Sequence, residues 1–149
     1  MSTASSRVLE DAKVGVRLKM SALWIATLFL FAYGDIFGFF KPGQIGEVIS
    51  GQVSGIKITQ VFLLGASVYI AIASVMVFLS LVLKPTVSRW TNIVLPILFI
   101  VSIAASVVGE TWAYFIFLSI AEIGLLLLIV WYAWTWPGRD GGHAASEDT

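Results

Sequence analysis

The chain has 149 residues, of which 58% are hydrophobic and 12% are charged, and its formal net charge is zero. This composition is far more apolar than that of a soluble domain and predicts an integral membrane protein. The absence of cysteine excludes disulfides, thiolate catalysis and iron–sulfur clusters, and the single histidine, His143, lies in a polar tail. We therefore expect no cofactor, no metal site and no binding of nucleic acid.

The N-terminal segment, residues 1–21, is basic and is expected to be cytoplasmic. With four spans both termini share one side of the membrane, and that side carries seven Lys and Arg residues against two on the other. The positive-inside rule then predicts a multi-pass protein of the bacterial cytoplasmic (inner) membrane with both termini in the cytoplasm. Val8, Ala12 and Val16 recur every four residues, which favours a short helix on the membrane surface; a partly ordered basic leader explains the pattern equally well.

Four apolar runs predict a membrane domain over residues 22–136, with spans at about 22–40, 58–83, 91–109 and 112–134. Each run is close to the roughly 20 residues that a helix needs to cross ~30 Å of hydrocarbon. No run alternates polar and apolar residues as the strands of a membrane barrel do. We therefore predict an all-α fold, an antiparallel bundle of four transmembrane helices in which short second and third loops make their helices neighbours.

The first loop and the C-terminal tail carry patterns of their own. Pro42 and Gly43 end the first helix, and Ile45, Val48 and Ile49 then recur at helical spacing. These residues predict a short amphipathic helix over Gln44–Ser50, in the outer loop. The tail, residues 137–149, is small, polar and rich in glycine, so we expect it to be disordered in the cytoplasm.

Small and weakly polar residues mark the packing faces of membrane helices, because lipid accommodates large apolar side chains as well as a bundle does. In the second span such a stripe consists of Gln60, Ser67, Ala71 and Ser74. We expect this stripe to face the bundle interior and Val77 to face lipid. Corresponding stripes in the third and fourth spans include Ser102 and Ser106, and Ser119 and Glu122.

Two acids, Asp35 and Glu122, lie within the predicted spans. Glu122 falls near the membrane midplane, where an ionised carboxylate costs at least a few kcal/mol. We expect Glu122 to be neutral at pH 7. Asp35 lies nearer the outer surface, where Lys41 or Lys57 could keep it ionised, and we expect it to bond to the outer loop or to Gln60.

These residues lead to two functional hypotheses. In the first, the candidate ligand-binding residues lie around a polar bundle interior that binds or transports a small molecule or cation, in a protein that forms a homo-oligomer; they are Asp35, Gln60, Ser67, Ser106 and Glu122. In the second, the protein is an accessory or structural component that packs against a larger membrane partner, and the acids only fix helix register. No nucleophile–base pair is evident, so we do not expect an enzyme.

Four stretches carry a family resemblance: "LKMSALWIATLFLFAYGDIFGFFKPG", "GIKITQVFLL", "MVFLSLVLKPTVSRWTNIV" and "AEIGLLLLIVWYAWTWP". Over Val14 to Pro137 they resemble a bacterial family of four-span membrane proteins of unknown function, domain-of-unknown-function family 6326. The matching positions are Asp35, Ile58 to Gln60, Arg89 to Asn92, and Glu122. The resemblance implies fold and membrane location but no activity. Small multidrug-resistance transporters are similar in size, but they place their key glutamate in the first span, where this chain has aspartate.

Overall fold

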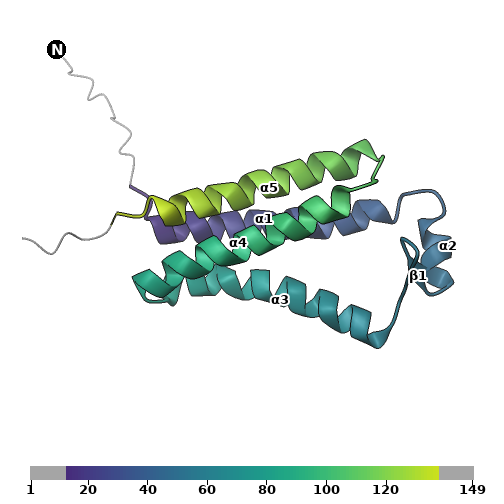
Figure 1. The fold of residues 1–149 in the computed structure, drawn as a ribbon, viewed down its shortest axis with the longest axis horizontal. Helices are drawn as coiled ribbons and strands as arrows, with labels where there is room; N and C mark the ends of the chain where they lie inside the picture. The colour runs from purple at the N-terminus through teal and green to yellow at the C-terminus, as the bar shows by residue number, and fades with distance from the viewer. Residues whose placement is uncertain (1–12, 138–149) are drawn as a thin grey trace, which may run out of the picture.

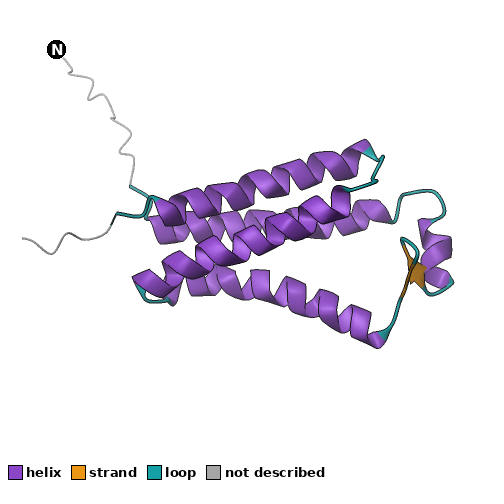
Figure 2. Cartoon of the chain, in the orientation of Figure 1, coloured by secondary structure: helices purple, strands orange, loops and turns teal. Residues whose placement is uncertain are grey.

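The computed structural model describes residues 13–137 and shows a bundle of four long helices with a small outer element (Figure 1). The predicted tail, residues 137–149, apart from Pro137, and most of the predicted surface helix lie outside the described residues. The long helices are α1 (Val16–Gly38), α3 (Gln60–Val82), α4 (Pro85–Val107) and α5 (Ala113–Trp134). A short helix, α2 (Gln44–Ile49), follows α1, and an antiparallel pair of two-residue strands, β1 (Gln52–Val53) and β2 (Ile56–Lys57), follows α2 (Figure 2).

The predicted all-α fold is confirmed, including the short helix in the first loop. All four long helices are long and apolar enough to span a membrane. α1 and α4 each begin six residues before the predicted spans, at Val16 and Pro85. Proline at the first helical position suits the start of α4. Long basic side chains such as Arg17 and Arg89 extend helices beyond the apolar run, because their charged ends reach toward water while their stems stay on the helix.

α1 and α5 form the centre of the bundle, with α3 packed mainly on α1 and α4 mainly on α5. We call the end that contains the start of α1, the α3–α4 turn and the end of α5 the basic end, and the opposite end the loop end. α3 and α4 touch near their turn and diverge toward the loop end (Figure 1). The predicted pairing of the second and third helices therefore holds only near the basic end.

An aromatic cluster of Trp24, Phe31, Tyr69 and Phe99 fills the space among α1, α3 and α4 at the middle of the bundle. The Tyr69 and Phe99 ring centroids are 4.3 Å apart, and Trp24 meets Phe99 edge-on at 5.7 Å. Toward the basic end, the buried core continues from Trp24 into apolar side chains of all four helices. Toward the loop end, no α3 residue before Tyr69 is buried. The loop-end half of α3 is therefore largely uncovered by the rest of the chain.

A buried polar cluster centred on Asn92 joins three helices near the basic end. The Trp24 Nε1–H donates to Asn92 Oδ1 at 2.8 Å, and the Ser80 hydroxyl lies 3.1 Å from the same oxygen. Asn92 Nδ2 donates to the Ser88 carbonyl at 2.8 Å. Trp24, Ser80, Ser88 and Asn92 are all fully buried. These bonds satisfy polar groups that have no access to water, and they fix the positions of α1, α3 and α4 relative to one another.

The predicted packing stripe of α3 is wrong for the single chain. Ser67, Ala71 and Ser74 are exposed, and α3 instead buries Ala73, Met76 and Ser80. The hydroxyls of Ser67 and Ser74 donate to carbonyls of their own helix, one turn back, so neither requires a neighbouring helix. Val77, which we expected to face lipid, is half-buried and packs against the core.

Candidate functional site

Asp35 and Glu122 lie on the two central helices, in the loop-end half of the bundle. Glu122, on α5, is only 7% exposed, whereas Asp35, on α1, is exposed in the single chain. Gly34, which precedes Asp35, faces Leu118 of α5, and Glu122 lies one helical turn after Leu118. The structure therefore places these two acids in one region, which we call the acid pair.

Two glycines of α1 face α5. A Cβ atom on Gly34 would lie 3.8 Å from Leu118 Cδ1, and one on Gly38 would lie 4.0 Å from the Tyr114 hydroxyl. Both neighbours belong to α5, so the glycine face of α1 is the face that packs against α5. Because Asp35 directly follows Gly34, this close packing holds its backbone beside α5.

Glu122 has no compensating charge and no hydrogen-bond partner among the described residues. No Lys or Arg occurs in α3, in α5, in α1 after Lys19, or in α4 after Arg89. Every side-chain nitrogen or oxygen in the described part of the chain that is fully inaccessible has a hydrogen-bond partner. The carboxyl oxygens of Glu122, which bond to nothing there, must therefore keep some accessible surface.

Hydroxyl groups from α3 and α4 meet at the level of the aromatic cluster. The Tyr69 hydroxyl is 2.7 Å from Ser102 Oγ. Ser102 Oγ donates its single proton to the Phe99 carbonyl at 2.8 Å. The Tyr69 hydroxyl must then be the donor to Ser102, which leaves its own oxygen free to accept a hydrogen bond. Tyr69 was missed by the sequence analysis, although its signal was visible as the one tyrosine in the second span.

The other three predicted site residues are not part of this region. Gln60 is the first residue of α3 and lies nine residues, or about 13 Å along the helix, before Tyr69. Ser67 and Ser106 are exposed, and each bonds to a carbonyl of its own helix. Of the five predicted residues, the structure brings together only Asp35 and Glu122.

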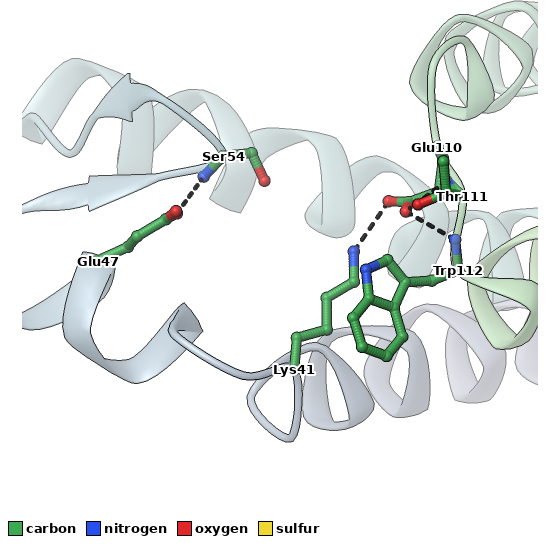
Figure 3. Close-up of polar contacts among 6 residues, drawn as sticks. All are labelled: Lys41, Glu47, Ser54, Glu110, Thr111 and Trp112. Atoms are coloured by element: carbon green, nitrogen blue, oxygen red, sulfur yellow. Dashed lines mark hydrogen bonds and ion pairs between the residues drawn. The ribbon is translucent and has the colours of Figure 1, made fainter.

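Asp35 also lacks the partners that we expected for it. It forms no hydrogen bond with Gln60 or with the described outer loop, and Lys41 pairs with another acid. Lys41 Nζ pairs with Glu110 Oε2 at 2.9 Å, across 69 residues of sequence (Figure 3). The Lys41 ammonium also lies 5.5 Å from the centroid of the Trp112 ring. In the sequence, this pair was visible only as a lysine in the first loop and a glutamate in the third loop. The two loops are predicted to lie on the same side of the membrane.

Backbone geometry prepares Glu110 for this ion pair. Gly109 has a φ of +84°, a left-handed turn that directs the chain from α4 to α5. Glu110 Oε1 then accepts the backbone N–H groups of Thr111 and Trp112 at 2.9 and 3.0 Å. The hydrogen bond from Lys41, followed by that from the Trp112 backbone, lowers the pKa of Glu110. The Lys41–Glu110 pair fastens the end of α1 to the α4–α5 turn.

The outer element has its own internal contact. Ser54 has a φ of 48° in the turn between β1 and β2, and its backbone N–H donates to Glu47 Oε2 at 3.2 Å (Figure 3). This bond holds the turn of the strand pair against α2. Neither Glu47 nor Ser54 contacts the acid pair or the Lys41–Glu110 pair through a hydrogen bond.

The acid pair has the chemistry of a site for a positive charge. Two carboxyl groups on neighbouring helices, one of them buried and neither paired with a base, attract a positive charge. The aromatic rings of Phe31 and Tyr69 lie 5.9 Å apart, between α1 and α3, and aromatic faces attract cations. Within residues 13–137 no group of three or more His, Asp or Glu side chains is placed to hold a metal ion.

Comparison with known proteins identifies a family but no activity. No curated protein and no solved structure shows significant similarity to the chain. A family model matches residues 10–141, which include every helix described above. The chain therefore belongs to the family of unknown function DUF6326.

Proposed function

We propose that the protein binds a small monovalent cation, or the ammonium group of a small molecule, between Asp35 and Glu122. The observation that carries this proposal is the unpaired carboxyl group of Glu122, in a side chain that is 93% buried. A buried acid without a partner is costly, and such acids inside membranes are usually functional. A bound cation would remove this cost, and the accessible oxygens of Glu122 give it a place to bind.

Access to this site is supported by the poor coverage of α3. Residues 60–68 of α3 include no buried side chain, and α3 diverges from α4 on the same side of the aromatic cluster as the loop end. A ligand would approach from the loop end and stop at Tyr69 and Phe99, whose rings are in close contact. Access from the loop end would allow binding and would correspond to one state of a transport cycle.

Isothermal titration calorimetry of the purified protein in detergent tests the proposal, with sodium, potassium and tetramethylammonium as probes. We expect at least one probe to bind and its affinity to fall as the pH is lowered, because protons compete for the same carboxyl groups. Glu122→Gln should weaken binding at least tenfold, since it removes a charge-assisted contact worth roughly 1.5–3 kcal/mol. Asp35→Asn should have a smaller effect, because Asp35 is exposed.

Glu47→Gln is the matched control, because Glu47 is an acid of the same size that lies in the outer element. It should leave probe binding unchanged. Failure of the wild-type protein to bind any probe, or an equal loss in Glu47→Gln and Glu122→Gln, would contradict the proposal.

In the absence of a cation, we propose that Glu122 carries a proton at neutral pH. An ionised carboxylate in this apolar half of the bundle would have no positive partner among the described residues. Infrared difference spectra of wild type and Glu122→Gln should show a protonated-carboxyl stretch at pH 7 in the wild type only. Addition of a bound cation should remove this band. Its absence from the unliganded wild type would show that Glu122 is ionised.

A second function is favoured by the exposed face of α3. In the single chain this helix leaves Gln60, Ser67, Ala71 and Ser74 uncovered along one stripe. Small residues allow the close approach of another helix, so this face suits a second copy or a larger membrane protein. In that accessory role the protein would have no ligand of its own. Native mass spectrometry from mild detergent separates the two functions, because it reports oligomeric state and retained ligands together.

For cellular location we propose the bacterial cytoplasmic membrane, with the basic end in the cytoplasm. Among the described residues the basic end carries Lys13, Arg17, Lys19, Lys84 and Arg89 and no acid. This asymmetry supports the positive-inside orientation. A reporter that functions only in the cytoplasm should be active when it is fused at Thr149. Activity of a periplasm-dependent reporter at the same position would show that the orientation is the reverse.

We also propose that the protein has a binding role rather than a catalytic one.

A further inference from the structure

A cavity of about 610 Å³ lies at the basic end, where α4 begins and α5 ends. Its lining includes Thr86, Arg89 and Trp90 from the first turns of α4, and Trp134 and Trp136 from the end of α5 and the residues after it. Its volume is in the range of small-ligand sites. We propose that this cavity binds the phosphate headgroup of an anionic phospholipid. The proposal is independent of the acid pair, which lies in the loop-end half of the bundle.

Arg89 is the residue that would hold the phosphate. One of its guanidinium nitrogens, Nη2, donates to the Trp134 carbonyl at 3.1 Å, and Cζ lies 5.9 Å from the centroid of the Trp134 ring. These contacts fix the half-buried side chain at the cavity wall. The Trp134 carbonyl is the only acceptor of Arg89 among residues 13–137. A guanidinium carries five N–H donors in a planar fork, so several donors remain for a phosphate.

The charge of the surrounding surface complements an anion. Arg17 lies 5.5 Å from the Trp136 ring, and Lys19 lies 5.2 Å from the Tyr132 ring, so two more cations are held near the end of α5. Lys84 immediately precedes α4. The described acids, by contrast, are all in the loop-end half or at the middle of the bundle. Basic pockets between transmembrane helices on one face of a membrane typically bind anionic lipid headgroups.

The apolar part of the cavity favours a lipid over a soluble anion. Trp90 and Trp134 are 57% and 61% exposed, and tryptophan side chains prefer the boundary between headgroups and hydrocarbon. Exposed apolar side chains continue from this rim along both helices, with Val94 on α4 and Trp131 and Leu127 on α5. A phospholipid could place its headgroup at Arg89 and its acyl chains against these residues. A free phosphate would leave the tryptophan surface unused.

Native mass spectrometry of the full chain tests the proposal, after equilibration with mixed micelles of phosphatidylglycerol and phosphatidylcholine in equal amounts. We expect the wild type to retain phosphatidylglycerol preferentially. Arg89→Gln should reduce the ratio of retained phosphatidylglycerol to phosphatidylcholine by about five- to tenfold, as expected for the loss of one well-placed cation at a membrane surface. Lys57→Gln is the matched control, because it makes the same change in charge at the loop end. It should leave the ratio unchanged.

Arg89→Lys keeps the charge and one donor to the Trp134 carbonyl but loses the planar fork, so its ratio should be intermediate. This variant also keeps the test decisive if Arg89→Gln does not fold. Equal retention of the two lipids by the wild type would overturn the proposal and leave the cavity to a neutral lipid or to the chain's own C-terminal residues. An equal effect of Arg89→Gln and Lys57→Gln would also overturn it, because net charge alone would then explain retention. Displacement of the lipid by millimolar inorganic phosphate would assign the site to a free anion instead.

Discussion

Replacing Asn92 with alanine should destabilise the bundle through one specific hydrogen bond. Asn92 Oδ1 accepts from Trp24 Nε1 and Ser80 Oγ, but the two donors differ in their alternatives. The Ser80 hydroxyl lies 2.7 Å from the Met76 carbonyl and can bond there when Asn92 is lost. The indole of Trp24 is fully buried and has no other acceptor among the described residues. Asn92→Ala therefore leaves one buried donor unpaired.

The cost of that unpaired donor sets the expected magnitude. Leaving a buried group unsatisfied costs about 1–3 kcal/mol in soluble proteins. Hydrogen bonds between membrane helices average only about 0.6 kcal/mol, with a maximum near 1.7 kcal/mol. Because the Trp24–Asn92 bond is short and completely buried, we expect a value near the upper part of the membrane range, about 1–1.7 kcal/mol. The lost volume of the Asn92 side chain adds a separate packing cost.

A double-mutant cycle separates the bond from the packing cost. Trp24→Phe removes the donor, and the coupling between Trp24→Phe and Asn92→Ala, measured by unfolding in mixed micelles containing dodecyl sulfate, should equal the expected 1–1.7 kcal/mol to within about 0.5 kcal/mol. The control cycle pairs Ser80→Ala with Asn92→Ala and should show much weaker coupling. If the Trp24–Asn92 coupling is below about 0.3 kcal/mol, the indole does not depend on Asn92 and the reasoning is refuted.

Two further predictions concern α3 and the loop end. Ala73 is fully buried and Ala71 is exposed, so Ala73→Leu should lower the unfolding midpoint in detergent by overpacking the core, at a cost of about 1–3 kcal/mol. Ala71→Leu should leave the midpoint nearly unchanged, and equal midpoints for the two variants would contradict the observed packing face. The Lys41–Glu110 pair should contribute no more than about 1 kcal/mol, because it lies at the surface. Folding lowers the pKa of Glu110 below its ordinary value of 4.5. The stabilisation by the ion pair is therefore fully present above about pH 4.5, and it is lost as the pH falls through the pKa of the folded state. The stabilities of wild type and Glu110→Gln should therefore converge at low pH, and a difference that persists there would exclude the ion pair as its cause.

Some features of the fold follow from local sequence patterns, whereas others depend on which residues meet. The four spans and α2 were predictable because helix formation in a membrane follows from the length of an apolar run and from residues such as Pro42 and Gly43 that end a helix. The packing face of α3 was not, because Ser67 and Ser74 bond to their own helix and carry no information about a neighbour. The face was instead determined by the fit of Ala73 against the core.

The candidate site also has parts that were predictable from the sequence and parts that were not. Asp35 and Glu122 were predictable, because an acid in an apolar span is visible without a structure. Their surroundings were not, because the positions of Tyr69 and Ser102 depend on the rotation of α3 and α4 about their own axes. The pairing of Lys41 with Glu110 joins residues far apart in the sequence, and one lysine in a loop does not reveal which acid it will meet.

The uneven attachment of α3 has a consequence for its motion. Every interhelical hydrogen bond of this helix in the described structure involves Tyr69 or a later residue. The Lys41–Glu110 pair joins the end of α1 to the α4–α5 turn and bypasses α3. Local opening of residues 60–68 should therefore require much less free energy than opening of α5, and their backbone amides should exchange with deuterium sooner. Tyr69, the first α3 residue that bonds to another helix, would then be the point about which the free half of α3 swings without unfolding the core.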